Sequence, residues 1–311
     1  MQTYKITSIT DVTDRVRQFD LLVADNTPLP AHDPGAHLDF QIPNVGERSY
    51  SLIDWPGNTD TFTIAVQRED DGDGGSQAMH GLTVGDTLKA SGPINDFKLN
   101  EGDTPRLLIA GGIGVTPIIS FATQLAARNA PFQFHVAARS AGICPFRETL
   151  ETTFGPHLTF WFDDTNQIDL QTLIASATPE THIFCCGPKG MIEAVRERAE
   201  SAGFAKDQIH FELFTSPATH VGDTPFEVEI ADSGQVFTIP ADKTIIEVLE
   251  AEGVDVMYDC ARGDCGICQT DVISGTPDHR DVVLSDAERA SGKVMQICVS
   301  RAKSARLVLD L

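Results

Sequence analysis

Hydrophobic positions follow three different patterns in successive parts of the chain. Up to about residue 103, short alternations of apolar and polar residues, as at 38–42 and 62–66, are separated by clusters of Gly, Pro, Asn and Asp. A period of two is typical of strands with one buried face, and regular turn signals between short strands indicate a small antiparallel β-barrel. We therefore predict an all-β domain over residues 1–103.

The next part, residues 104–217, combines apolar runs with helical periodicity. Strands are expected at 107–110, 132–138, 158–162, 182–185 and 210–214, with helices after residue 116 and over 191–202. Strands that alternate with helices predict a parallel sheet, here in an α/β nucleotide-binding domain. A polar stretch at 218–224 reads as a linker.

The last part, residues 225–311, has the pattern of a small α+β domain. A hairpin is expected from 226–230 and 235–239, an amphipathic helix over 244–252, and a closing strand at 306–311. Between the helix and the closing strand lies a cysteine-rich loop. The whole chain is thus predicted to be multidomain: a barrel, an α/β domain and a β-grasp-like domain.

Four cysteines in this last part have the spacing of a metal centre. Cys260, Cys265 and Cys268 form a C-x4-C-x2-C run, and Cys298 lies thirty residues further on. This is the plant-type spacing for a [2Fe–2S] cluster held by four thiolates. Small residues inside the run let the loop follow the cluster closely and aim backbone N–H groups at its sulfurs.

Other uses of these cysteines fit less well. Structural zinc prefers two C-x2-C hooks or Cys/His pairs, and one such hook is present. Disulfides are not expected in a long chain with seven cysteines and no export signal at its start. Chance proximity in the sequence is the remaining alternative. Because disulfides are not expected, the other three cysteines, Cys144, Cys185 and Cys186, need no disulfide partners.

The net charge of the chain restricts the classes of partner that it is expected to bind. The formal net charge is −22, which disfavours nucleic acid and anionic membrane surfaces. It permits docking to a protein with a basic patch, although an acidic balance mostly serves solubility. Residues 107–127 carry no charge, but glycines and a proline interrupt them, so we expect no membrane span. The expectation is a soluble cytoplasmic protein.

Within the barrel part, residues 48–51 offer groups that suit a flavin. Arg48 and Tyr50 alternate with Ser49 and Ser51 on a predicted strand, so the two pairs point to opposite faces. An Arg offers a forked donor for phosphate, a Tyr a ring face, and a Ser hydroxyl a hydrogen bond to a heterocycle nitrogen. Such strands are also common in protein cores, which is the alternative interpretation.

A glycine-rich stretch further along suits an anion. Gly74, Gly75 and Ser76 lead into a short predicted helix, which Ser76 is expected to cap. Backbone N–H groups at such a helix start favour a phosphate. The alternative is a plain hairpin tip. The aspartates at 70, 71 and 73 would repel a phosphate, so they are expected to face water.

The α/β part carries a second glycine-rich turn. Gly112 and Gly114 lie between the first strand and its helix, where glycine lets a pyrophosphate approach the backbone. Thr116 is expected as the N-cap and Pro117 as the first helical residue. The turn lacks the full G-x-G-x-x-G fingerprint, so this motif alone does not settle the ligand.

Two further positions are expected at the same sheet edge. Cys186, Gly187 and Pro188 follow the 182–185 strand, and the ends of parallel strands are where a nicotinamide should lie. A buried free cysteine is the alternative for Cys186. Arg139 follows the second strand, where it could meet the 2′-phosphate of NADPH or simply be solvated.

Electron counting connects the three parts. A nicotinamide gives up two electrons as a hydride, whereas a [2Fe–2S] cluster takes one at a time. A flavin can accept the pair and release the electrons singly. A dinucleotide domain and a cluster domain on one chain therefore predict a flavin between them, in the barrel.

The order of these features resembles the phthalate dioxygenase reductase family, which includes vanillate demethylase reductases and other reductases of Rieske oxygenases. The resemblance covers essentially the whole chain and is strongest at 276–281 and 298–302. It implies FMN rather than FAD, and NADH rather than NADPH. The cluster loop departs from relatives at Ala261, Arg262 and Asp264, which should alter the cluster potential or the docking partner rather than ligation.

The resemblance also implies roles for individual residues. Ser51 would steady the flavin N5 and Cys186 would help form the nicotinamide pocket, which makes them the candidate catalytic residues. Thr116 would lie on the nicotinamide side and Phe214 would shield the flavin face. The implied flavin contacts are Arg48, Ser49, Tyr50, Ser51, Val66, Gln67 and Arg68, with Gly74, Gly75 and Ser76 at the phosphate.

The predicted function is the reductase component of a two-component Rieske oxygenase or demethylase. Electrons would pass from NADH through FMN and the [2Fe–2S] cluster to a separate oxygenase. One alternative is a flavin reductase that acts on small acceptors such as a quinone or a ferric chelate. The other is a non-enzymatic module with a structural metal.

Overall fold

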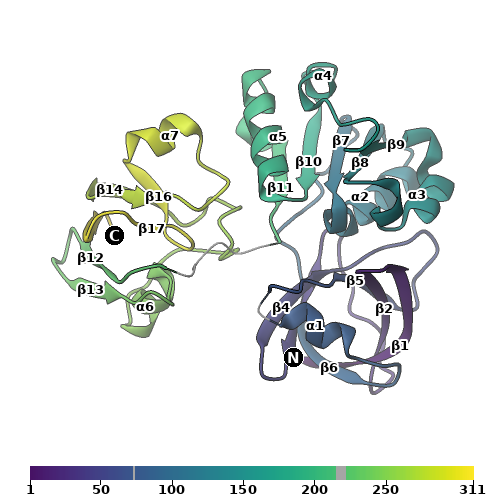
Figure 1. Ribbon diagram of the computed structural model, residues 1–311, viewed down its shortest axis with the longest axis horizontal. Coiled ribbons are helices and arrows are strands. Elements are labelled where there is room, and N and C mark those ends of the chain that lie inside the picture. The colour runs from purple at the N-terminus through teal and green to yellow at the C-terminus, as the bar shows by residue number, and fades with distance from the viewer. Residues whose placement is uncertain (73, 215–221) are drawn as a thin grey trace. The chain divides into compact units, whose positions relative to one another are not determined.

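The computed structural model describes residues 1–72, 74–214 and 222–311 (Figure 1). The chain forms two compact units, residues Met1–Glu212 and Leu213–Leu311. Asp73 and most of the predicted linker, 218–221, lie outside the described residues. The aspartates at 70 and 71 are exposed, as expected.

The first half of unit 1 is a six-stranded antiparallel sheet with the order β4-β3-β6-β1-β2-β5. Its elements are β1 (Gln2–Thr13), β2 (Val16–Val23), β3 (His37–Ile42), β4 (Gly46–Ser51), β5 (Phe62–Gln67), α1 (Gly75–His80) and β6 (Thr87–Ile94). Alternate residues of β3 are buried, including Leu38, Phe40 and Ile42, which confirms the period-two prediction. The buried faces enclose the core of the barrel.

The second half of unit 1 is a five-stranded parallel sheet with the order β11-β10-β7-β8-β9. Its strands are β7 (Arg106–Gly111), β8 (Phe132–Ala138), β9 (Leu158–Phe162), β10 (His182–Cys186) and β11 (Ile209–Glu212). Its helices are α2 (Val115–Ala127), α3 (Arg147–Phe154), α4 (Leu170–Ala175) and α5 (Lys189–Ser201). Every residue of β7 is buried, as a central parallel strand requires.

The uncharged run 107–127 is divided between β7, the 3₁₀ turn η1 (Gly112–Gly114) and the 13-residue helix α2. Further 3₁₀ turns are η2 (Ala141–Ile143), η3 (Gly155–His157) and η4 (Lys206–Gln208). Within the described ranges, no helix has the length and apolar character needed to cross a membrane.

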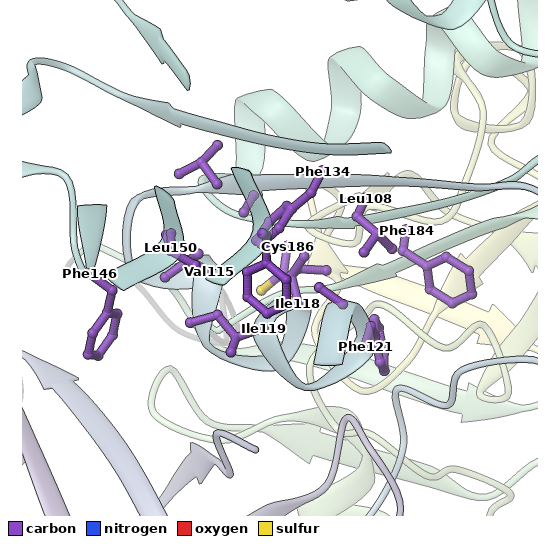
Figure 2. Close-up of a cluster of buried hydrophobic side chains, with 14 of the residues drawn as sticks. Leu108, Val115, Ile118, Ile119, Phe121, Phe134, Phe146, Leu150, Phe184 and Cys186 are labelled. Atoms are coloured by element: carbon purple, nitrogen blue, oxygen red, sulfur yellow. The ribbon is translucent and has the colours of Figure 1, made fainter. Parts of the chain in front are cut away.

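The barrel and the α/β half share one hydrophobic core. Barrel residues Ile53 and Phe97 belong to the same buried cluster as Phe121 of α2 and Phe184 of β10. The Phe97 ring lies 4.9 Å from that of Phe121 and 6.0 Å from that of Phe184, measured between centroids. Figure 2 shows part of this cluster around α2. The predicted boundary near residue 103 falls between β6 and β7, but the packing continues across it.

Unit 2 has the predicted α+β character. A mixed sheet of order β13-β12-β18-β14-β16 is accompanied by the two-stranded β15-β17. Its elements are β12 (Phe226–Ile230), β13 (Val236–Ile239), α6 (Ile245–Ala251), β14 (Gln269–Ser274), β15 (Pro277–Asp278), α7 (Asp286–Ser291), β16 (Val294–Gln296), β17 (Arg301–Ala302) and β18 (Arg306–Leu309). Thr244 and Glu247 form a capping box that starts α6, since each side chain bonds the other residue's N–H.

One helix start differs from the prediction. Helix α2 begins at Val115 with Gly114 as its N-cap, so Pro117 is the third helical residue rather than the first. The turn Gly112–Gly114 runs directly into the helix and supplies its N-cap. Proline is still tolerated there, because the first N–H groups of a helix have no intrahelical partner. The Thr116 hydroxyl donates to the Ile113 carbonyl (3.1 Å) and does not cap.

Candidate functional site

The four cysteines of the predicted cluster come together in unit 2. Cys260, Cys268 and Cys298 are buried, and Cys265 is partly exposed. The Cys260 sulfur lies within hydrogen-bonding reach of the Cys265 and Cys298 sulfurs, and Cys298 also reaches Cys268. The structure therefore assembles residues from the C-x4-C-x2-C loop and from the segment after β16 around one point.

Electrostatics at this point suit a cationic centre. Hydrogen bonds from the Cys265 and Cys298 thiols lower the pKa of Cys260, and the Arg262 N–H, 3.3 Å from the Cys260 sulfur, adds to the effect. The pKa of Cys265 is raised, chiefly by its hydrogen bond to Cys260. Without a metal, four thiols this close cannot all ionise. Bound iron removes that conflict, since every thiolate then has a cationic partner.

The backbone of the loop is shaped to approach a bound group closely. Gly263 has φ +81° and Gly266 has φ +80°, and a Cβ on Gly263 would lie 2.6 Å from Val299 Cγ2. The Gly263 carbonyl accepts a hydrogen bond from the Val282 N–H at 3.0 Å. Residues 278–284 thus support the loop from behind.

In the described part of the chain, no three His, Cys, Asp or Glu side chains meet the geometry of a single-ion site.

Buried charges hold that supporting segment. Arg280 donates two hydrogen bonds to Asp223, at 2.6 and 2.8 Å, and two to Asp278, at 2.9 and 3.0 Å. Arg301 lies 3.5 Å from Asp223, donates to the carbonyls of Lys243 and Pro240, and covers the Phe226 ring. Two members of this charge network, Asp278 and Arg280, belong to the segment 276–281, where the resemblance to the family is strongest.

One of the loop residues that depart from the family pattern, Asp264, has an unusual environment in the structure. Asp264 is buried beside Cys260, and burial raises its pKa to about 7 although Arg262, at 3.4 Å, opposes the shift. The Leu213 N–H, at the start of unit 2, donates to Asp264 Oδ2 at 2.9 Å. The sequence showed a charge change here but not that this carboxyl is buried.

The predicted flavin residues of unit 1 also lie together. Arg48 on β4 packs over Gly75 at the start of α1, where an added Cβ would lie 2.9 Å from its Cγ and Nε atoms. Ser49 donates to Asp39 on the neighbouring β3. Burial raises the pKa of Tyr50 to about 12, and its ring centroid is 5.9 Å from that of Phe40. Ser51 is buried at the end of β4.

The loop after β5 differs from the prediction in one detail. Ser76 is not the cap of α1: the N-cap is Gly74, in the left-handed conformation with φ +83°. The Ser76 hydroxyl instead accepts from the Glu69 N–H at 2.9 Å and so closes the 69–76 loop. Val66 is buried and Gln67 donates to Glu69. Arg68 pairs with Asp70 at 3.1 Å, and both are exposed.

The two glycine-containing segments of the α/β half meet where the strand order reverses. The chain runs from β7 to β8 on one side and returns as β10 on the other, so the β7/β10 boundary is the switch point at which open α/β sheets bind ligands. A Cβ on Gly114 would lie 2.3 Å from the Cys186 carbonyl oxygen. One on Gly187 would lie 3.0 Å from Gly111 Cα, and one on Gly111 2.7 Å from Pro188 Cδ.

Gly111 was not among the predicted site residues, although it directly follows the predicted strand 107–110; in the structure it is the last residue of β7. An added Cβ on Gly111 would also lie 2.8 Å from the Met191 sulfur, so the sheet edge is closely packed at this point. Gly112 has φ +55° and open space at its Cβ position. The open space at Gly112 would let a pyrophosphate approach the main chain of the turn.

The remaining predicted nucleotide residues occupy different environments. Cys186 and Thr116 are buried, and Cys186 lies in the same apolar cluster as Val115 and Ile118 (Figure 2). Arg139 is exposed just beyond β8. Phe214 is 42% exposed and belongs to unit 2. Their roles toward a cofactor stay predictions.

Comparison with known proteins identifies the family of the chain. Residues 228–303 match the 2Fe-2S iron-sulfur cluster binding domain. The chain is 41% identical over 306 residues to the vanillate O-demethylase oxidoreductase of Pseudomonas sp. (strain HR199 / DSM 7063), with 96% of each chain covered. It belongs to the phthalate dioxygenase reductase family.

A solved structure and a second relative support the same family assignment. The structure of phthalate dioxygenase reductase, described as modular for electron transfer from pyridine nucleotides to [2Fe-2S], superposes with a TM-score of 0.73 at 35% identity, covering 99% of this chain and 97% of that one. Tetrachlorobenzoquinone reductase of Sphingobium chlorophenolicum is 36% identical over 315 residues, covering 98% and 97%. The chain is thus an oxidoreductase with a barrel, a nucleotide-binding sheet and a [2Fe–2S] ferredoxin-type domain.

Proposed function

We propose that the protein is the NADH-dependent reductase component of a two-component oxygenase or demethylase, and that its partner is a separate Rieske oxygenase. One observation carries the proposal: a single chain combines a glycine-lined nucleotide edge with a four-cysteine cradle. Such a chain can accept a hydride at one site and give out single electrons at another.

When bound, FMN would take the hydride from NADH, and the cluster would pass electrons on singly. The chain's own residues position these groups. Arg48, packed on Gly75, would meet the flavin phosphate as a forked donor, with backbone N–H groups of 74–76 beside it. The close packing of Gly111, Gly114 and Gly187 would hold the turn at the strand ends, and the open space at Gly112 would admit the dinucleotide. Cys260, Cys265, Cys268 and Cys298 would hold the iron.

Two side chains are proposed to adjust the hydride step. Ser51 ends β4 and would steady the flavin N5 by a hydrogen bond. Cys186 lies beneath the turn, with its carbonyl against Gly114, so it would shape the nicotinamide pocket from below. Cys186→Ala should therefore slow hydride transfer and leave flavin and iron content intact. Hydride transfer at the wild-type rate would remove this role from Cys186.

Spectroscopy of the purified protein tests the main proposal. Flavin and [2Fe–2S] absorbance should both be present and both bleach on anaerobic addition of NADH, more readily than with NADPH. Flavin released by heat should chromatograph as FMN. Under turnover, a Rieske oxygenase should accept the electrons. A protein without these two absorbances, or one that NADH does not bleach, would contradict the proposal.

A second candidate, reduction of a small acceptor, is favoured by the likeness to tetrachlorobenzoquinone reductase. In that case a free quinone would be reduced faster than any protein acceptor. Cys298→Ser would then leave quinone reduction intact if electrons leave from the flavin, but abolish reduction of an oxygenase. The ratio of the two rates in wild type and variant separates the candidates.

A further inference from the structure

Helix α2 is apolar on most of its surface, and the Ser120 side chain on it is completely buried. Ser120 is 0% exposed. A helical serine commonly donates to a carbonyl one turn earlier in its own helix. Ser120 instead donates to the Leu52 carbonyl at 2.9 Å and accepts from the Asp54 N–H, also at 2.9 Å. One hydroxyl thus satisfies two backbone groups of the barrel.

The segment that Ser120 holds continues the predicted flavin strand. Leu52 directly follows Ser51, the last residue of β4. Its own N–H donates to Ala36 at 2.8 Å, and the next N–H, of Ile53, donates to Thr63 at 2.8 Å. The segment therefore has no freedom on the barrel side, and Ser120 fixes it on the helix side.

On the helix side, Ser120 lies one turn after Thr116, about 6 Å along the axis. Thr116 follows the turn Gly112–Gly114, which lies against Cys186 and Gly187. The same rigid helix thus carries the glycine turn at its start and the barrel contact one turn later. A shift of α2 along or across the barrel segment would move the nucleotide edge by the same amount.

Apolar packing alone does not fix such a register. Ile53, Phe97 and Phe121 hold the two halves together, but dispersion contacts are non-directional and permit small displacements. Two hydrogen bonds to adjacent backbone groups do specify a position, because their strength falls steeply with distance and angle.

We propose that Ser120 is a positioning residue for hydride transfer: by binding Leu52 and Asp54 it sets the distance between the flavin strand and the nicotinamide edge. The inference rests on the proposed function, because it assumes flavin at β4 and nicotinamide at the β7/β10 edge. A misplacement of about 1 Å can cost about 100-fold in rate, so a partial shift should cost about 10-fold.

The test uses the flavin- and iron-loaded full-length protein. Ser120→Ala removes both hydrogen bonds and almost no volume. Mixed anaerobically with excess NADH, the variant should reduce its flavin about 10-fold more slowly than wild type, with an unchanged NADH dissociation constant and a larger deuterium isotope effect at the transferred position. Flavin content, iron content and reduction by dithionite should match wild type.

Thr123→Ala is the matched control. Thr123 lies three residues on in α2, and its Oγ1 is buried with no hydrogen-bond partner among the described residues. Its removal should leave the hydride step unchanged. If Ser120→Ala does not retain flavin, Ser120→Cys serves instead, because a thiol is a weaker donor and acceptor of similar size.

The outcomes are distinct. Hydride transfer at the wild-type rate in a flavin-loaded Ser120 variant would overturn the proposal, as would an equal loss in Thr123→Ala, which would indicate general loosening of the helix. A loss in NADH affinity with no change in the reduction rate would also overturn it. Failure of the proposed function looks different, since NADH would then not bleach the wild-type protein.

Discussion

The β7/β10 edge and the cluster loop are both proposed to bring main chain close to a redox group, but they are built differently. At the edge, Gly114 packs against the Cys186 carbonyl and Gly187 packs against the Gly111 main chain. The cluster loop is supported by residues 278–284, which buried Arg280 fixes through Asp223 and Asp278. The edge should therefore be sensitive to atoms added, and the loop to charges removed.

This difference follows from what each region must do. A dinucleotide enters and leaves, so its site needs an open surface of main-chain donors, which glycine provides. A cluster stays bound, so its loop can be held by permanent interactions of the domain that surrounds it. The two regions then predict separable effects of substitution.

Removal of a cluster ligand should give the largest effect. Cys298→Ser takes one thiolate from the buried group of four sulfurs, and the [2Fe–2S] absorbance should be lost. Flavin reduction by NADH should continue, because the nucleotide edge belongs to the other unit. Iron analysis and anaerobic flavin bleaching check the two statements. Loss of both activities would show that the regions depend on each other.

An added methyl group at the sheet edge should come next. Gly114→Ala places a Cβ 2.3 Å from the Cys186 carbonyl oxygen, so the turn must move. We expect kcat/KM for NADH to fall at least about 10-fold, or about 1.4 kcal/mol. Gly190→Ala is the control, since Gly190 lies near the start of α5 with open space around its Cβ position. Equal kinetics in both variants would refute the backbone-packing argument.

Loss of a buried charge in the ferredoxin unit should lower the stability of that unit. Arg280→Gln leaves Asp223 and Asp278 without their main partner and should lower the free energy of unfolding of that unit by about 3 kcal/mol. Arg306→Gln breaks ion pairs with Glu227 and Glu229 that are 31–45% exposed, so it should change the unfolding midpoint little. Denaturant titration of the cluster absorbance compares them. Matching midpoints would mean that burial does not matter here.

The smallest effect should depend on pH. His32 lies 2.8 Å from Asp54. Burial lowers the pKa of His32, but the hydrogen bond and charge of Asp54 raise it more, and the net pKa is raised. The stabilisation is therefore full below about pH 6.5 and is lost as pH rises through the folded-state pKa. His32→Gln should lower stability by about 1 kcal/mol at pH 6 and less at pH 9. A pH-independent difference in melting temperature would contradict the ion pair.

Periodicity and spacing predicted much of this molecule. The limits of β8 and β9 agree with the apolar runs at 132–138 and 158–162, because an apolar run is a continuous signal even where, as in β9, the residues are only partly buried. The cysteine spacing brought four sulfurs together because ligand geometry constrains sequence directly. Arg48 and Gly75 were both proposed at the flavin phosphate, and the structure places them in contact.

Other features depend on tertiary packing and left weaker signals. Pro117 looked like a helix start, but the turn before it is already helical. Ser76 looked like a cap, but its hydroxyl closes a loop instead. Ser120 was passed over in an apolar helical pattern. A hydroxyl one turn after Thr116 was the available signal, and its partners, 66 and 68 residues away, could not be identified from sequence.

The common interior of the first 212 residues limits how such proteins can be recombined. A cut near residue 103 would expose Ile53, Phe97, Phe121 and Phe184 together, so each half would present part of an open apolar cluster, although the barrel keeps a core of its own. A cut after Glu212 divides no such cluster. Exchange of ferredoxin modules between reductases should thus preserve the first unit, whereas exchange of barrels should require a redesigned surface on α2.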